Sequence, residues 1–101
     1  MRVNVAKALK AFEQGREYRG SESVSARVVA DYPVLFSYGT PLLARVSERY
    51  VFNVSHYSVT TTTQQNAIRV WLAANVPAGD VIEVNGVPRG GSFLYLTDAV
   101  N

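Results

Sequence analysis

The chain has 101 residues, of which 48% are hydrophobic and 18% are charged, and this balance predicts a single small globular domain over residues 1–101. Cysteine is absent, which excludes disulfides, thiolate metal sites and a cysteine nucleophile, and favours a reducing cytoplasm. No apolar run approaches the roughly 18 residues of a membrane span, and no secretory signal is recognisable, so we expect no membrane association.

The first predicted element is a helix over residues 3–14 with a basic outer face. Asn4 is its expected N-cap and Gly15 its expected stop, and the polar residues 16–23 are expected to form a loop. The apolar stripe of this helix consists of Val5, Leu9 and Phe12, at positions i, i+4 and i+7.

The net charge of +2 is concentrated in this first part of the chain. Residues 1–20 hold five basic and two acidic side chains, whereas residues 21–101 hold five basic and six acidic ones. Such a segment favours an anionic partner, and the alternative is a solvated helix face. The basic residues concerned are Arg2, Lys7, Lys10, Arg16 and Arg19.

Residues 24–31, 42–46 and 50–54 alternate between apolar and polar side chains, which is typical of strands with one buried face, and 34–38 is a short apolar run. Pro33 is expected to end the first strand, 38–41 to form a turn, and 47–49 to close a hairpin. The predicted strands cover 24–31, 34–38, 42–46 and 50–54.

A second amphipathic helix is predicted over residues 62–75, after a run of four threonines at 60–63 and before the stop signal Pro77. The threonines fall where a helix needs side-chain oxygens for its free N–H groups. The expected capping residues are Thr61 or Thr62 as the N-cap, with Gln64 or Gln65 reaching back as a capping box.

The threonine run also predicts an anion site, since one threonine suffices for a cap and β-branched residues are poor inside a helix. The helix dipole and the free N–H groups both favour a phosphate at this end. Arg69 would contribute if the anion lay beside the helix. The alternative is capping alone. The candidate residues are Thr61, Thr62, Thr63 and Arg69.

The last part of the chain predicts a strand over 81–84 followed by an Asn-Gly pair at 85–86, which favours a hairpin. Pro88 excludes the return limb from a central strand. The Arg-Gly-Gly run at 89–91 is either a backbone nest for an anion or a flexible turn, and 93–96 is a strand or a docked coil.

Together these elements predict an α+β fold. We expect an antiparallel sheet, built from 24–57 and 81–96, to pack against the helix over 62–75, with the N-terminal helix over 3–14 alongside. The expected core residues are Leu9, Val28, Phe52, Val54, Ile68, Trp71 and Leu72.

The sequence contains no pattern typical of catalysis or metal binding. His56 is the only histidine and lacks a partner at metal-ligand spacing, and the eight carboxylates are scattered. Neither Gly-x-Ser-x-Gly nor Gly-x-x-x-x-Gly-Lys occurs. We therefore expect a protein that is not an enzyme and that uses no metal or cofactor.

The segment over 53–69, with its Tyr-Ser-x-Thr-Thr core at 57–61, resembles small uncharacterised proteins of bacteriophages and related mobile elements. The Tyr-Gly-Thr-Pro-Leu stretch at 38–42 is similar too, so the likeness covers about residues 36–72. The resemblance implies a small accessory protein in a bacterial host cytoplasm and no established activity.

These observations predict a non-catalytic accessory binding protein whose partner is anionic, nucleic acid being the first candidate. The basic residues of the first helix would contact phosphates, with the threonine run as a second contact. Six tyrosines could stack on nucleic acid or form protein interfaces. The alternative is a protein-interaction module that binds a host protein or assembles into a homo-oligomer.

Overall fold

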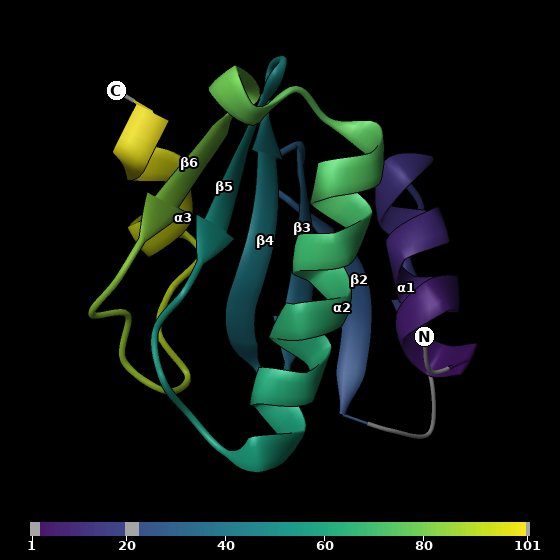
Figure 1. Ribbon diagram of the computed structural model, residues 1–101, viewed down its shortest axis with the longest axis vertical. Helices are drawn as coiled ribbons and strands as arrows, with labels where there is room; N and C mark the ends of the chain where they lie inside the picture. Colours follow the sequence, from purple (N-terminus) through teal and green to yellow (C-terminus); the bar gives the residue numbers. More distant parts are fainter. Residues whose placement is uncertain (1–2, 20–22, 101) are drawn as a thin grey trace.

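The computed structural model describes residues 3–19 and 23–100 of the chain. A six-stranded sheet carries two helices on one face and a short helix near the C-terminus on the other (Figure 1). In chain order the elements are α1 (Val3–Glu13), β1 (Tyr18–Arg19), β2 (Val24–Val29), β3 (Tyr32–Ser37), β4 (Thr40–Val46), β5 (Arg49–Asn53), α2 (Val59–Asn75), the 3-10 turn η1 (Ala78–Asp80), β6 (Val81–Val84), α3 (Leu94–Thr97) and the 3-10 turn η2 (Asp98–Val100).

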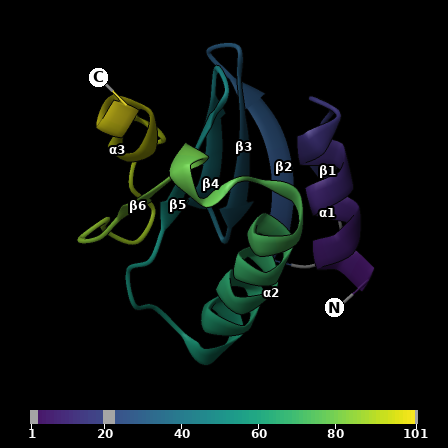
Figure 2. The same cartoon turned by 45° about the horizontal axis from the view of Figure 1, so that its top comes forward.

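The strands lie in the sheet in chain order, and every neighbouring pair is antiparallel except the last. β5 and β6 run parallel, because α2 crosses one face of the sheet between them. Figure 2 shows α1 and α2 side by side on that face, with α3 on the opposite side of the sheet. The α+β fold predicted from the sequence is confirmed, but the sheet is not wholly antiparallel.

Tight turns that contain residues with positive φ angles join each of the strands β2, β3, β4 and β5 to the next one. Ala30 and Asp31 have φ of 50° and 70°, and Tyr38 and Gly39 have φ of 50° and 81°, so both central residues of each turn are left-handed. That combination is typical of type I′ turns, whose twist matches that of the flanking strands. Only the first central residue, Ser47 at 57°, is left-handed in the turn between β4 and β5.

Both prolines of the meander lie within strands, whereas Pro33 was predicted to end a strand and Pro41 to lie in a turn. Pro33 is the second residue of β3 and pairs with Val28, near the hairpin end where a missing N–H is tolerated. The predicted turn over 38–41 is shorter than expected, because Thr40 and Pro41 already belong to β4. The register between β3 and β4 shifts between Leu35 and Phe36, where Leu42 is an extra residue in β4 next to Pro41.

Three sequence predictions outside the meander are wrong. The Asn-Gly pair at 85–86 starts no hairpin, because the chain leaves the sheet after β6 and crosses to the opposite face. Residues 94–96 of the predicted strand or coil over 93–96 belong to the short helix α3, and Phe93 is its N-cap. Part of the predicted loop over 16–23 forms β1, which pairs with the start of β2.

Helix α1 ends at a left-handed glycine, as predicted. Gly15 has φ of 67° and donates to the carbonyl of Phe12 at 3.1 Å, while Arg16 donates to the carbonyl of Ala11 at 2.8 Å. These two bonds form a Schellman motif. Asn4 is not the N-cap; it lies within α1, and its Oδ1 accepts a 2.9 Å hydrogen bond from the hydroxyl of the tyrosine in β1.

The core is divided by the sheet into two apolar clusters, a larger one beneath α1 and α2 and a smaller one beneath α3. Trp71 and Val54 are half-buried against the larger cluster. The prediction for Val28 is wrong: it is 38% exposed and belongs to neither apolar cluster. Four predicted core residues are fully buried, namely Leu9, Phe52, Ile68 and Leu72.

Candidate functional site

Helix α2 begins at Val59, earlier than the predicted residue 62, and its N-cap is a serine. The Oγ of Ser58 accepts a hydrogen bond of 3.2 Å from the N–H of Thr61. The predicted cap at Thr61 or Thr62 is therefore wrong. Low threonine propensity favoured a later start, but the threonines lie within the first turns of the helix because their hydroxyls find partners there.

The hydroxyls of the threonine run mostly bond within the protein. Thr62 donates to the carbonyl of Ser58, and Thr63 to that of Val59, each at 3.1 Å. Such bonds to the preceding turn let a hydroxyl-bearing β-branched residue occupy a helix. Thr61 is buried, 4% exposed, and its Oγ1 lies 3.3 Å from the Oγ of Ser37. Thr62 and Thr63 are exposed along the helix side.

The two glutamines that follow are buried and form no capping box. The Nε2 of Gln64 donates to the Oγ of Ser23 at 2.6 Å, and its Oε1 accepts from Ser37. Gln65 donates from Nε2 to two backbone carbonyls, that of the last residue of β5 and that of Ser55, each at 2.9 Å. Both side chains therefore tie α2 to the sheet and do not reach back to the helix end.

Asn53, at the end of β5, completes this polar network. Its Nδ2 donates to the carbonyl of Pro41 and to the hydroxyl of Tyr57, and its Oδ1 accepts from the N–H of Ser55, all at 2.9 Å. Within the described ranges 3–19 and 23–100, no buried side-chain nitrogen or oxygen lacks a partner. A fully paired buried network of this kind holds its members in one arrangement.

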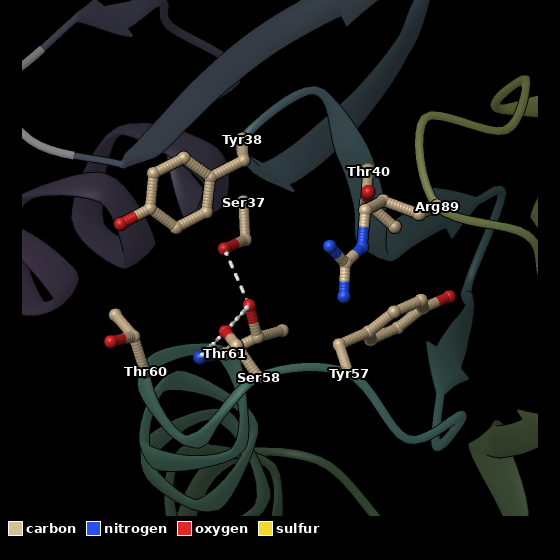
Figure 3. Close-up of a pocket in the computed structure, with 8 residues that line it drawn as sticks. All are labelled: Ser37, Tyr38, Thr40, Tyr57, Ser58, Thr60, Thr61 and Arg89. Carbon is tan, nitrogen blue, oxygen red and sulfur yellow. Dashed lines mark hydrogen bonds between the residues drawn. The ribbon is translucent and has the colours of Figure 1, made fainter.

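A pocket of about 450 Å³ opens where this network reaches the surface. It lies between the β3–β4 turn, the start of α2 and the loop after β6 (Figure 3). The volume is in the range of small-molecule sites. Its walls carry hydroxyls, two aromatic rings and one guanidinium; the lining residues are Ser37, Tyr38, Thr40, Tyr57, Ser58, Thr60, Thr61 and Arg89.

Hydrogen bonds fix the backbone of the loop that carries Arg89, whose side chain is exposed. The N–H of Gly90 donates to the buried Oγ1 of Thr40 at 2.8 Å, and the N–H of Gly91 donates to the carbonyl of Pro88 at 2.9 Å. A Cβ on Gly91 would lie only 2.9 Å from that carbonyl oxygen, so the tight turn requires glycine here. These amides are used within the fold and form no free nest.

The guanidinium of Arg89 reaches into the pocket toward the hydroxyls at the start of α2 (Figure 3). Among the residues that the structure describes, no carboxylate lies within 4.0 Å of it, and the ion pair found joins Arg69 and Glu83. A positive charge without a neighbouring carboxylate attracts a mobile anion. Arg89 was not among the predicted site residues, because the Arg-Gly-Gly run at 89–91 indicates only a nest or a turn.

The two tyrosines that line the pocket differ in how firmly their side chains are held. Tyr57 is fixed, because its hydroxyl donates to the carbonyl of Val87 and accepts from Asn53. Tyr38, at the tip of the β3–β4 turn, is 67% exposed. Figure 3 shows its ring on the side of the pocket opposite to Arg89 and Tyr57.

The basic residues predicted as contacts do not line this pocket. Lys7 and Lys10 are exposed on α1, Arg16 follows the helix stop, and Arg19 is exposed in β1. We refer to these exposed residues of α1, β1 and the segment between them as the α1–β1 surface, which also carries the exposed Glu13 and Glu17. Helix α1 lies on the same face of the sheet as α2 (Figure 2). Arg2 lies outside the described residues.

Arg69 also lies away from the pocket. Its Nη1 is 3.4 Å from the Oε2 of Glu83 in β6, and its guanidinium lies 5.1 Å from the centre of the Phe52 ring. Both charged side chains are more than half exposed, at 55% and 56%. The pair is therefore a solvent-screened surface ion pair.

No group of three histidine or acidic side chains able to hold a metal is found within residues 3–19 and 23–100. His56 is exposed in the segment between β5 and α2. None of the helices over these residues is both long enough and apolar enough to cross a bilayer.

No protein-family model matches this chain, no curated protein matches it, and no solved structure matches it. The pocket at the start of α2 is therefore interpreted from its own geometry.

Proposed function

We propose that this protein is a non-catalytic binding domain that recognises an anionic group in the pocket at the start of α2, and that nucleic acid is its partner. The observation that carries the proposal is the Arg89 guanidinium, which faces hydroxyls across the pocket and has no described carboxylate beside it. Guanidinium groups bind phosphates and carboxylates with paired, charge-assisted hydrogen bonds.

The surroundings of Arg89 favour an anion for two further reasons. The first N–H groups of α2, those of Val59 and Thr60, precede the first bond of the helix and lie at its positive end. The buried network behind the pocket also fixes Ser37 and Thr61, so the wall does not have to be ordered when a ligand binds.

Nucleic acid is favoured over a small free anion because the α1–β1 surface adds exposed cations outside the pocket. A polyanion can contact Arg89 together with the exposed Lys7, Lys10, Arg16 and Arg19, whereas a single phosphate cannot. Binding of this kind releases counterions, so it weakens steeply as salt rises.

The proposal is tested by fluorescence anisotropy with a labelled oligonucleotide in about 50 mM and about 200 mM salt. We expect Arg89→Gln to weaken binding at low salt by about tenfold or more, because it removes a charge-assisted contact worth about 1.5–3 kcal/mol. Arg89→Lys, which keeps the charge, should lose less than Arg89→Gln.

Arg45→Gln is the matched control, because Arg45 is an exposed arginine that does not line the pocket. It should lower the affinity much less than Arg89→Gln. Equal losses would mean that only the overall charge matters and would contradict a site at the pocket. Absence of binding by the unaltered protein at low salt would end the proposal.

A second candidate is a protein-interaction module, favoured by the open edge of the sheet. β6 pairs only with β5 among the described strands, and such an edge can add a strand from another chain. Leu94 and Tyr95 on the nearby α3 are 48% and 51% exposed. Light scattering over a concentration series tests self-assembly; a monomer at all concentrations would exclude a homo-oligomer built on this edge.

A further inference from the structure

We propose that the pocket receives one unpaired nucleotide of a single-stranded nucleic acid, with its base stacked on Tyr38 and its phosphate at Arg89. This inference rests on the proposed function and goes further by naming the form of nucleic acid and the residue that selects it. Three features of the pocket support it: the exposure of Tyr38, the position of its ring relative to the Arg89 guanidinium, and the volume of the pocket.

The first feature is the exposure of Tyr38. A tyrosine ring that is 67% exposed gains little from burial. Its backbone has φ of 50° in a turn position that glycine and asparagine fill more readily. Ala30 and Ser47 tolerate similar angles in neighbouring turns, but neither carries a large apolar side chain. The ring of Tyr38 therefore stands free, with a face available to a ligand.

The second feature is the position of this ring relative to Arg89. The two side chains lie on opposite sides of the same pocket, with the hydroxyls of Ser37 and Thr61 between them (Figure 3). A nucleotide has an apolar, flat base at one end and a phosphate at the other. Aromatic rings bind bases by stacking, and guanidinium groups bind phosphates, so the two ends of the pocket match the two ends of a nucleotide.

The third feature is the volume of the pocket. About 450 Å³ is in the range of sites for one small molecule. In a duplex the bases are stacked on each other, and their faces are not accessible to a protein ring unless a base is extruded at a cost of a few kcal/mol. A single strand presents the same base face without that cost. The geometry therefore favours unpaired nucleic acid over a duplex.

The test compares three labelled probes of roughly 12 nucleotides in anisotropy titrations with the full chain at low salt. The probes are a single-stranded oligothymidine, the same strand with every base removed, and a duplex. We expect the single strand to bind about tenfold more tightly than the abasic strand, since base stacking on an aromatic ring contributes about 5-fold to 150-fold per base. It should also bind more tightly than the duplex.

The outcomes separate this inference from the proposed function. If the abasic strand or the duplex binds as tightly as the single strand, and Arg89→Gln weakens all of them, the anion site stands and base recognition is overturned. If no probe binds at low salt, both proposals fail. The comparison of the three probes itself uses the unaltered protein and does not depend on the folding of a variant.

Tyr38 is tested directly with a matched pair of substitutions. Tyr38→Asn removes the ring and retains a residue that accepts positive φ, so the turn should keep its shape. It should weaken single-strand binding by about tenfold and leave abasic-strand binding unchanged. Tyr38→Phe keeps the ring and should bind like the unaltered protein. Equal affinity of Tyr38→Asn and the unaltered protein, or an equal loss in both variants, would overturn stacking on this ring.

Discussion

The buried face of helix α2 is polar in the first half of the helix and apolar in the second half. The buried residues of α2 follow one stripe at helical spacing: Thr61, Gln64 and Gln65 in the first half, and Ile68 and Leu72 in the second. The second half contacts the larger apolar cluster, whereas the first half hydrogen-bonds to side chains and carbonyl groups of the sheet. One helix thus joins an apolar core to a polar one.

The difference between these halves indicates a division of roles. Burial of apolar side chains stabilises the fold without requiring a particular orientation. Buried polar groups contribute little net stability, yet each requires a correctly placed partner, so they determine geometry. The polar half of α2 lies directly behind the pocket that holds Tyr38 and Arg89. We infer that the apolar half stabilises the domain and that the polar half positions the candidate site.

The largest expected loss of stability comes from removing a buried apolar side chain in the second half of α2. Ile68→Ala should lower the free energy of unfolding by about 2–5 kcal/mol, because it removes a fully buried side chain and leaves a cavity. Denaturant unfolding followed by circular dichroism measures the change. Val70→Ala is the control, since Val70 is 66% exposed in the same helix and should change stability by about 0.5 kcal/mol or less. Similar losses in both variants would contradict the core assigned to α2.

A smaller effect is expected in the polar half. Gln65→Met keeps the length of the side chain but leaves the buried carbonyls of Asn53 and Ser55 without this donor, so stability should fall by about 1–3 kcal/mol. Asn66→Met, at an exposed position next in the chain, should change stability by about 0.5 kcal/mol or less. A gain in stability for Gln65→Met would show that these hydrogen bonds are not needed for the fold.

The smallest effect concerns the helix start and distinguishes the observed cap from the predicted one. Ser58→Ala should cost about 1 kcal/mol, because the N–H of Thr61 loses its acceptor. Thr62→Ala should be neutral or slightly stabilising, since Thr62 lies inside the helix and alanine has the higher helix propensity. Thermal unfolding of the two variants side by side measures this. A larger loss for Thr62→Ala would favour the start expected from the sequence.

Much of the fold could be predicted because local rules determine it. The apolar stripe and glycine stop of α1, the alternating strands of the meander, and the end of α2 before Pro77 all depend on residues close together in the chain. The Asn-Gly pair at 85–86 was misleading, since a turn signal does not reveal whether a partner strand follows. The start of α2 could not be predicted from the low helix propensity of threonine, because hydrogen bonds from the hydroxyls of Thr62 and Thr63 to the preceding turn offset it.

The sequence by itself determined the element types, the α+β class and the presence of surplus hydroxyls before the second helix. The tertiary structure alone decided which of those hydroxyls are buried, that β6 lies parallel to β5, and that Arg89 and Tyr38 meet at one pocket. The physical reason is distance along the chain. Gln64 bonds to Ser23, and Gly90 bonds to Thr40, across 41 and 50 positions, and no local pattern encodes such contacts.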